Sequence, residues 1–166
     1  MPKANDREGG APARSGLDMS SPQESIGYNV RRADVYLREQ FRRLLGSWYV
    51  RPVEYSILRL VQSNPAATQA EISDALYIKR QNMGGLVARL ARLGWLRRGV
   101  DPTDRRRQSL LLTETGAKRL ATLTRAAASM DREITRGWSE AERATIVKLL
   151  QRLYQTVTVA GRRSKR

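Results

Sequence analysis

The chain has no cysteine and no histidine, and only one of its 166 residues is phenylalanine. Because it has no thiol, disulfides, thiolate zinc sites and thiol-based redox sensing are excluded. Because it has no imidazole, it lacks the commonest metal ligand and the commonest general base near neutral pH, which excludes catalytic triads and histidine-based metal sites. We therefore expect a protein that is not an enzyme and that binds no cofactor.

Long apolar runs are absent as well. No stretch of the sequence approaches the length of a membrane span, and residues 1–20 lack the apolar core of a signal peptide. We therefore expect a cytoplasmic protein. At this length the chain is expected to form one domain whose core is stable without disulfide bonds or other cross-links.

Positive charge is what the sequence has in excess, with 31 Lys and Arg against 16 Asp and Glu and a net charge of +15. Residues 79–107 alone hold nine Lys or Arg and two Asp, a net of +7 in 29 residues. Clustered guanidinium groups bind phosphate and displace its counterions. A charge run is usually only a solvated face, but this one falls on a predicted helix and hairpin, and it therefore predicts nucleic-acid binding.

Two short helices are predicted within residues 68–93. Thr68 and Glu71 form a capping box that opens the first helix. The second helix is basic and is expected over residues 79–93, with Gly94 ending it. Its predicted buried side consists of Met83, Leu86, Val87, Leu90 and Leu93. This order is typical of a helix-turn-helix.

An arginine-rich hairpin follows the two helices. Residues 95–100 and 108–112 are the strand candidates, and residues 101–104, with the sequence Asp-Pro-Thr-Asp, form a turn between them. The whole arrangement predicts a winged helix-turn-helix, with one helix for the major groove of DNA and a basic loop for the backbone and the adjacent minor groove.

Long amphipathic helices are predicted on both sides of the winged helix-turn-helix in the sequence. The first has Ser21 as N-cap, Pro22 at its first helical position and Glu24 closing a capping box, and it should run to about Gly46. Its apolar stripe consists of Ile26, Val30, Ala33, Leu37, Phe41, Leu44 and Leu45. Such a length suggests a partner surface.

Three further helices complete the predicted secondary structure. Pro52 begins one of them, and an Asn-Pro pair ends it. Thr113 caps a long helix, and Ser139 with Glu142 opens the last helix, which Gly161 should end. The apolar stripe of the last helix consists of Ile146, Leu149, Leu150, Leu153 and Val157.

The predicted fold class is mainly α with a small β-wing. The expected regions are a disordered leader (1–20), a helical dimerisation region (21–49 and 113–160), a DNA-binding lobe (50–112) and a basic tail (161–166). Because the terminal stripes need a second surface, we expect a homodimer; the alternative is a single monomeric bundle. Two reading helices related by a two-fold axis suit a palindromic operator with half-sites about one helical turn apart.

Two amide side chains near the start of the basic helix are the best candidates for contacts to DNA bases, and we call them the base readers. Gln81 and Asn82 are assigned this role because an amide can bond N6 and N7 of adenine together. The alternative is that they solvate the first turn or contact phosphates. The residues assigned to backbone phosphates, which position the protein without specifying sequence, are Lys79, Arg80, Arg105 and Arg107.

The wing reads Arg98-x-x-Asp101-Pro102-x-Asp104-Arg105-Arg106 and is followed by Leu112-Thr113-Glu114-x-Gly116. With this motif as the most specific match, the chain resembles the MarR family of bacterial transcription regulators over residues 22–157. Residues 72–76 match too, as do residues 89–94 with the Arg-Leu and Leu-Gly pairs at their ends. The resemblance implies a triangular homodimer of winged helix-turn-helix lobes, often released from DNA by a small anionic or aromatic ligand.

The resemblance also assigns roles within the wing. Arg106 would enter the minor groove, while Asp104 would brace the wing together with Arg98. We also assign Gly85 and Arg89 to the DNA-binding set.

Three departures from the family pattern stand out. Ser73 replaces a small apolar residue, and Tyr77 occupies a turn where glycine is common. Gly84 and Gly85 lie inside the recognition helix, where each costs about 1 kcal/mol relative to Ala. Either this helix settles only on DNA, or glycine allows a close approach to phosphate.

In the family the ligand site lies between the dimerisation helices and the reading lobe. The candidates there are Tyr28, Arg42, Arg43, Trp48 and Tyr49. Aromatic rings with arginine suit an aromatic carboxylate or an acyl-CoA, although aromatics at a helix junction are more often core. Residues 51–56 and the Asn-Met pair at 82–83 are similar to a subgroup that controls the catabolism of hydroxycinnamates and related aromatic acids.

The sequence therefore predicts a dimeric, ligand-responsive transcriptional repressor. One alternative is a nucleoid-like protein that binds DNA without sequence preference or ligand, which the high charge would suit. A second is an RNA-binding module, which would need exposed aromatic rings for base stacking that this chain places poorly. An enzyme comes last, for want of a catalytic constellation.

Overall fold

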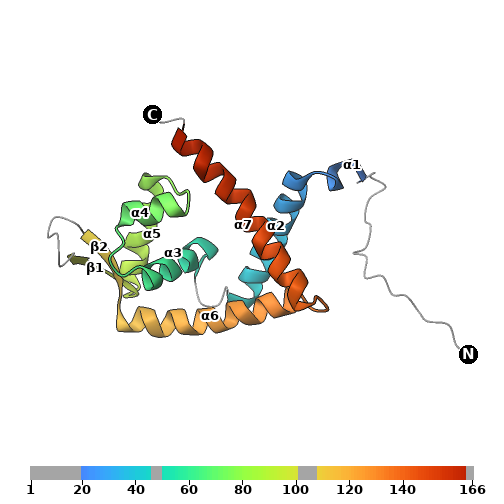
Figure 1. Cartoon of the computed structure of the whole chain (residues 1–166). Helices are drawn as coiled ribbons and strands as arrows, with labels where there is room; N and C mark the ends of the chain where they lie inside the picture. The colour runs from blue at the N-terminus through green and yellow to red at the C-terminus, as the bar shows by residue number, and fades with distance from the viewer. Residues whose placement is uncertain (1–19, 46–49, 101–107, 164–166) are drawn as a thin grey trace, which may run out of the picture. The chain divides into compact units, whose positions relative to one another are not determined.

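The computed structural model describes residues 20–45, 50–100 and 108–163, and at residue 100 and residues 156–163 it describes the backbone alone. The elements are α1 (Ser20–Gln23), α2 (Ile26–Leu45), α3 (Pro52–Ser63), α4 (Gln69–Ala75), α5 (Arg80–Arg92), β1 (Leu96–Val100), β2 (Gln108–Leu112), α6 (Glu114–Ile134) and α7 (Glu140–Arg163) (Figure 1). The chain divides into two compact units, residues 1–39 and 40–166. The predicted class, mainly α with a small β hairpin, is confirmed.

The predicted start of the first long helix is wrong. In place of one helix capped by Ser21, the structure has the single turn α1 and then α2. The hydroxyl of Ser25 accepts a hydrogen bond from the backbone N–H of Tyr28 at 3.5 Å, and the side-chain amide of Asn29 donates to the Ser25 carbonyl at 2.9 Å. Ser25 therefore holds the N-terminus of α2, because local side-chain bonds to the backbone compete with helix continuation.

The core of the second unit lies among α3, α4, α5, α6 and the hairpin. Its largest fully buried side chains include Ile57, Leu58, Met83, Leu90, Leu120 and Leu123. Contacts join α3 to α4, α6 and β2, and α5 to α4 and β1. The apolar faces predicted for α3, α5 and α6 therefore form one core that supports the two short helices.

The end of α5 differs from the prediction at one position. Leu93 is 39 % exposed rather than buried. Gly94 has a φ of +70°, and the backbone N–H of Trp95 donates to the carbonyl of Leu90 at 3.0 Å. This C-terminal capping motif turns the chain away, and Trp95 and Leu96 take the next buried positions instead.

The hairpin is antiparallel; β1 starts one residue later than predicted, and β2 covers the predicted residues. Leu96 pairs with Leu112 and Val100 with Gln108 in its register. The expected turn falls on residues 101–107, which lie outside the described part of the chain. Thr113 follows β2 and caps α6 as predicted, since its hydroxyl accepts from the backbone N–H of Gly116 at 2.9 Å.

Gly116 fixes how closely α6 approaches the base of the hairpin. A Cβ at this position would lie 2.0 Å from the backbone carbonyl oxygen of Trp95, a contact that backbone movement alone could relieve. We expect Gly116→Ala to lower the free energy of unfolding by about 1–3 kcal/mol, measured by urea denaturation. Gly85→Ala is the matched control, because a Cβ at Gly85 meets nothing within 4 Å. It should stabilise α5 by up to about 1 kcal/mol, and equal stability of the two variants would contradict the packing argument.

The last helix begins as predicted but ends later. Ser139 and Glu142 form the expected capping box, with the Ser139 hydroxyl and backbone N–H each 2.7 Å from the Glu142 carboxylate. These hydrogen bonds hold the pKa of Glu142 below its usual value. The helix continues through Gly161 to Arg163, so the predicted stop at Gly161 is wrong; a single glycine costs a helix only about 1 kcal/mol. None of the described helices is long and apolar enough to cross a bilayer.

Candidate nucleic-acid interface

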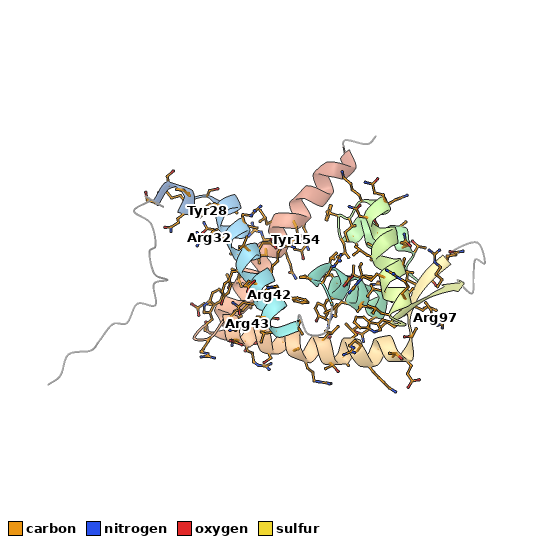
Figure 2. All side chains as sticks on the ribbon, turned by 180° about the vertical axis from the view of Figure 1, so that it is seen from behind. Tyr28, Arg32, Arg42, Arg43, Arg97 and Tyr154 are labelled. Atoms are coloured by element: carbon orange, nitrogen blue, oxygen red, sulfur yellow. The ribbon has the colours of Figure 1, made fainter. Side chains whose placement is uncertain are left out.

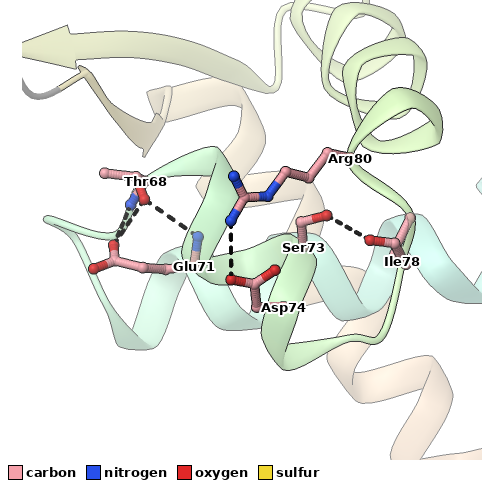
Figure 3. Close-up of polar contacts among 6 residues, drawn as sticks. All are labelled: Thr68, Glu71, Ser73, Asp74, Ile78 and Arg80. Atoms are coloured by element: carbon pink, nitrogen blue, oxygen red, sulfur yellow. Dashed lines mark hydrogen bonds and ion pairs between the residues drawn. The ribbon is translucent and has the colours of Figure 1, made fainter. Parts of the chain in front are cut away.

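Hydrogen bonds hold both the start of α4 and the turn that leads from α4 to α5 (Figure 3). Thr68 caps α4, and the Glu71 carboxylate accepts from the Thr68 backbone N–H at 2.8 Å, which confirms the predicted capping box. Ser73 is fully buried, and its hydroxyl donates to the backbone carbonyl of Ile78 at 2.6 Å. Tyr77 adopts a φ of +52°, in the left-handed region that favours glycine. The first two departures from the family pattern are thus accommodated: Ser73 is satisfied, and Tyr77 takes the glycine conformation.

The first turn of α5 presents polar side chains to solvent. Lys79 is the N-cap, and Arg80, Gln81 and Asn82 are all exposed, while Met83 behind them is fully buried. The side-chain amides of Gln81 and Asn82 are therefore both exposed to solvent, and the helix that carries them is held to the core by Met83.

One ion pair spans the turn. The Arg80 guanidinium lies 3.4 Å from the Asp74 carboxylate, and both side chains are mostly exposed (Figure 3). An exposed pair at this distance contributes little to stability. Arg80 therefore remains available to exchange this partner for a phosphate.

Arg89 was assigned to the DNA-binding set, but in the structure it forms an ion pair inside the protein. Its Nη1 atom lies 2.7 Å from both carboxylate oxygens of Glu54, which is fully buried. The Arg89 side chain itself is 27 % exposed. Its charge is therefore compensated inside the protein, and we withdraw Arg89 from the proposed DNA contacts. Sequence reasoning missed Glu54, although its place on the same helix face as Ile57, Leu58 and Val61 was the available signal.

The hairpin strands bring two arginines to the base of the wing. The Arg98 guanidinium donates to the Gln108 side-chain oxygen at 2.8 Å. The expected partner, Asp104, lies outside the described residues together with Arg105, Arg106 and Arg107. Arg97 is exposed on β1 (Figure 2), and it was not among the predicted contacts. Its place in the basic cluster of the sequence was the signal that could have included it.

The residues predicted for a ligand site fall in different parts of the chain. Tyr28 belongs to the unit of residues 1–39, where its hydroxyl accepts from Arg32 at 3.1 Å. Arg42 and Arg43 belong to the other unit, where Arg43 pairs with Glu133 at 2.9 Å. The remaining two candidates, Trp48 and Tyr49, lie outside the described residues.

An open cavity of about 540 Å³ lies between the end of α3 and α4, and it contains none of these candidates. Its lining includes Leu60, Pro65, Glu71, Ile72 and Ala75. The predicted ligand site therefore stays a prediction.

Comparisons with known proteins agree on one family. Residues 50–107 match the model of the MarR family. A putative transcriptional regulatory protein for the hcr operon of Thauera aromatica is 32 % identical over 150 residues, which cover 88 % of this chain and 90 % of that protein.

Two solved structures of the transcriptional repressor CouR are also similar to the chain. CouR bound to a 23-mer DNA duplex matches with a TM-score of 0.78 and 28 % identity, over 84 % of this chain and 99 % of that one. CouR bound to p-coumaroyl-CoA matches with a TM-score of 0.73 and 26 % identity, over 83 % and 97 % of the two chains. The chain belongs to the MarR family of DNA-binding transcription regulators.

Proposed function

We propose that the protein is a homodimeric, sequence-specific repressor that a small aromatic carboxylate or its CoA thioester releases from a palindromic operator. The observation that carries the proposal is the first turn of α5. Its polar residues Lys79, Arg80, Gln81 and Asn82 are exposed, while the next residue, Met83, is buried in the core. In this arrangement Gln81 and Asn82 read bases. Lys79 and Arg80 contact phosphates, as do Arg105 and Arg107, while Arg106 enters the minor groove.

Exposed apolar side chains on the terminal helices support a dimer. On α7, Ile146, Leu149, Leu150 and Leu153 are 40–53 % exposed. On α2, Ile26, Val30 and Leu37 are exposed as well. Contiguous apolar faces of this kind mark association sites, and a second copy of the chain would cover the same faces on both partners.

The effector class is supported by chemistry and by one relative. CouR binds p-coumaroyl-CoA, an aromatic thioester that carries phosphates. Arg42 and Arg43 are exposed and could meet a carboxylate or phosphate, with Trp48 and Tyr49 supplying aromatic surface nearby in the sequence. Release by such a compound requires that it bind the DNA-free form more tightly than the DNA-bound form.

Fluorescence anisotropy on DNA from upstream of the protein's own gene tests this proposal. A scrambled duplex and other promoter regions are run beside it at physiological salt. A preference of about a thousandfold or more supports a specific regulator. The complex is then titrated with p-coumarate and p-coumaroyl-CoA, and sedimentation gives the oligomeric state. Release by neither compound would remove p-coumarate and its CoA thioester as effectors, and a monomer would contradict the proposed dimer.

A nucleoid-like protein is the second candidate. The net charge of +15 and the sequence pI of about 11.2 favour it, since they would support binding to any duplex. Equal affinity for every duplex tested, with a steep dependence on salt, would establish this candidate in place of the repressor.

The double variant Gln81→Ala/Asn82→Ala tests the assignment of the base readers. Each lost bidentate contact should reduce discrimination between operator and scrambled DNA by about 1–3 kcal/mol, because amides specify bases whereas phosphate contacts do not. The measurement is the ratio of the two dissociation constants. An equal loss on both duplexes would identify the amides as phosphate contacts instead.

A further inference from the structure

Glu54 is a carboxylate buried in the lobe that carries the reading helix. It lies in the first turn of α3 and is fully buried. Its oxygens accept from the backbone N–H of Arg51 at 2.9 Å and from Nη1 of Arg89 at 2.7 Å each. The carboxylate thus ties the start of α3 to the third turn of α5, two segments that lie 35 residues apart.

The pair supplies a directional anchor that the apolar contacts of α5 do not. Met83, Val87 and Leu90 hold the helix down, but apolar packing is non-directional. A hydrogen-bonded ion pair fixes both rotation and tilt. Arg89 lies eight residues beyond Gln81, about 12 Å along the helix, so a tilt of about 5° at the pair would move the amide end by about 1 Å. A shift of that size exceeds the tolerance of a positioned polar contact, which is about 0.5 Å.

We propose that Glu54 is a positioning residue for DNA reading: through Arg89 it sets the orientation of α5, and neither residue contacts DNA. The proposal rests on the base-reading role of α5 proposed above. It explains why a charge lies fully buried in the lobe, where an apolar residue would otherwise fit.

The charge balance of the pair separates this role from a direct contact. Because Glu54 already neutralises Arg89, the arginine releases no counterion when the protein binds DNA. Glu54→Gln removes the negative charge and so breaks the ion pair. Under our proposal this misaligns Gln81 and Asn82 and weakens binding to the operator. If Arg89 were a phosphate contact restrained by Glu54, the same substitution would free it, raise the affinity and steepen the dependence on salt.

The experiment compares the full-length wild type with Glu54→Gln on the operator and on scrambled DNA across a salt series. Misalignment of one base contact should weaken operator binding by about tenfold or more, leave scrambled DNA within about twofold, and keep the salt slope unchanged. Tighter binding with a steeper slope would overturn the proposal, and so would unchanged discrimination.

Two more variants control for folding. Glu54→Gln/Arg89→Gln removes both charges and so leaves neither uncompensated, and Arg89→Lys keeps the positive charge while losing the planar guanidinium. Both should show the loss of discrimination, with urea denaturation confirming that they are folded. Either variant folded and with wild-type discrimination would count against the role of the pair.

Hydrogen exchange without DNA distinguishes failure of this proposal from failure of the proposed function. Glu54→Gln should speed amide exchange in α5 while leaving α6 unchanged. If the wild type prefers no duplex, the repressor proposal fails, but selective exchange in α5 would still establish the pair as its anchor. Exchange equal to wild type in α5 would refute that anchor on any DNA result.

Discussion

Raising the salt concentration from about 50 to about 200 mM should weaken operator binding by about four orders of magnitude. The proposed phosphate contacts of each protomer are Lys79, Arg80, Arg105 and Arg107, which makes about eight for a dimer. Each contact releases about 0.9 counterion, so log K should fall against log salt with a slope of about −7, and a fourfold rise in salt then costs about ten-thousandfold. Anisotropy titrations at several salt concentrations measure the slope directly.

Two substitutions on the same helix turn serve as controls for this slope. Lys79→Gln removes one phosphate contact from each protomer and should make the slope shallower by about two for the dimer. Gln81→Ala removes an uncharged side chain and should change affinity without changing the slope. A wild-type slope near −2 would show that most of the basic cluster does not touch the backbone, and the wing would then leave the mechanism.

The short-range features of this fold could be predicted because their causes are local. The capping boxes at Thr68 and Ser139 and the turn at Gly94 each depend on residues within one helical turn, and all three are confirmed. The same locality explains the error at Ser21. Ser21 and Ser25 are both good N-caps, and the choice between them depends on the bonds that Asn29 adds at Ser25.

The long-range features could not be predicted from a single sequence. No residue near Arg89 in the chain indicates Glu54 as its partner, because the two residues lie 35 positions apart on different helices and only the fold brings them together. In the charge pattern Arg89 therefore appears as one more member of a basic face. The sequence likewise marks Ser73 only as a departure from the family pattern. The structure shows the reason for the residue, because its hydroxyl donates to the carbonyl of Ile78.

The ion pair should also be the most sensitive polar site for stability, and its two halves should differ. Arg89→Ala leaves the Glu54 carboxylate fully buried without a cation, and breaking a buried pair in this way costs about 3–5 kcal/mol. Glu54→Ala should cost less, because the Arg89 side chain is 27 % exposed and can reach water. Urea denaturation of the two single variants and of the double alanine variant measures both costs and their coupling.

The asymmetry is the informative part, because it separates a desolvated charge from simple loss of packing. Glu54 is fully buried whereas the Arg89 side chain is 27 % exposed, so packing alone would make Glu54→Ala at least as damaging as Arg89→Ala. Lys118→Ala, which breaks the exposed pair with Glu114, is the control and should leave stability close to that of wild type. Equal costs for the two core variants, or a larger cost for Glu54→Ala, would mean that Glu54 acts by its volume rather than by its charge. The orientation of α5 would then have to be explained by Met83, Val87 and Leu90 alone.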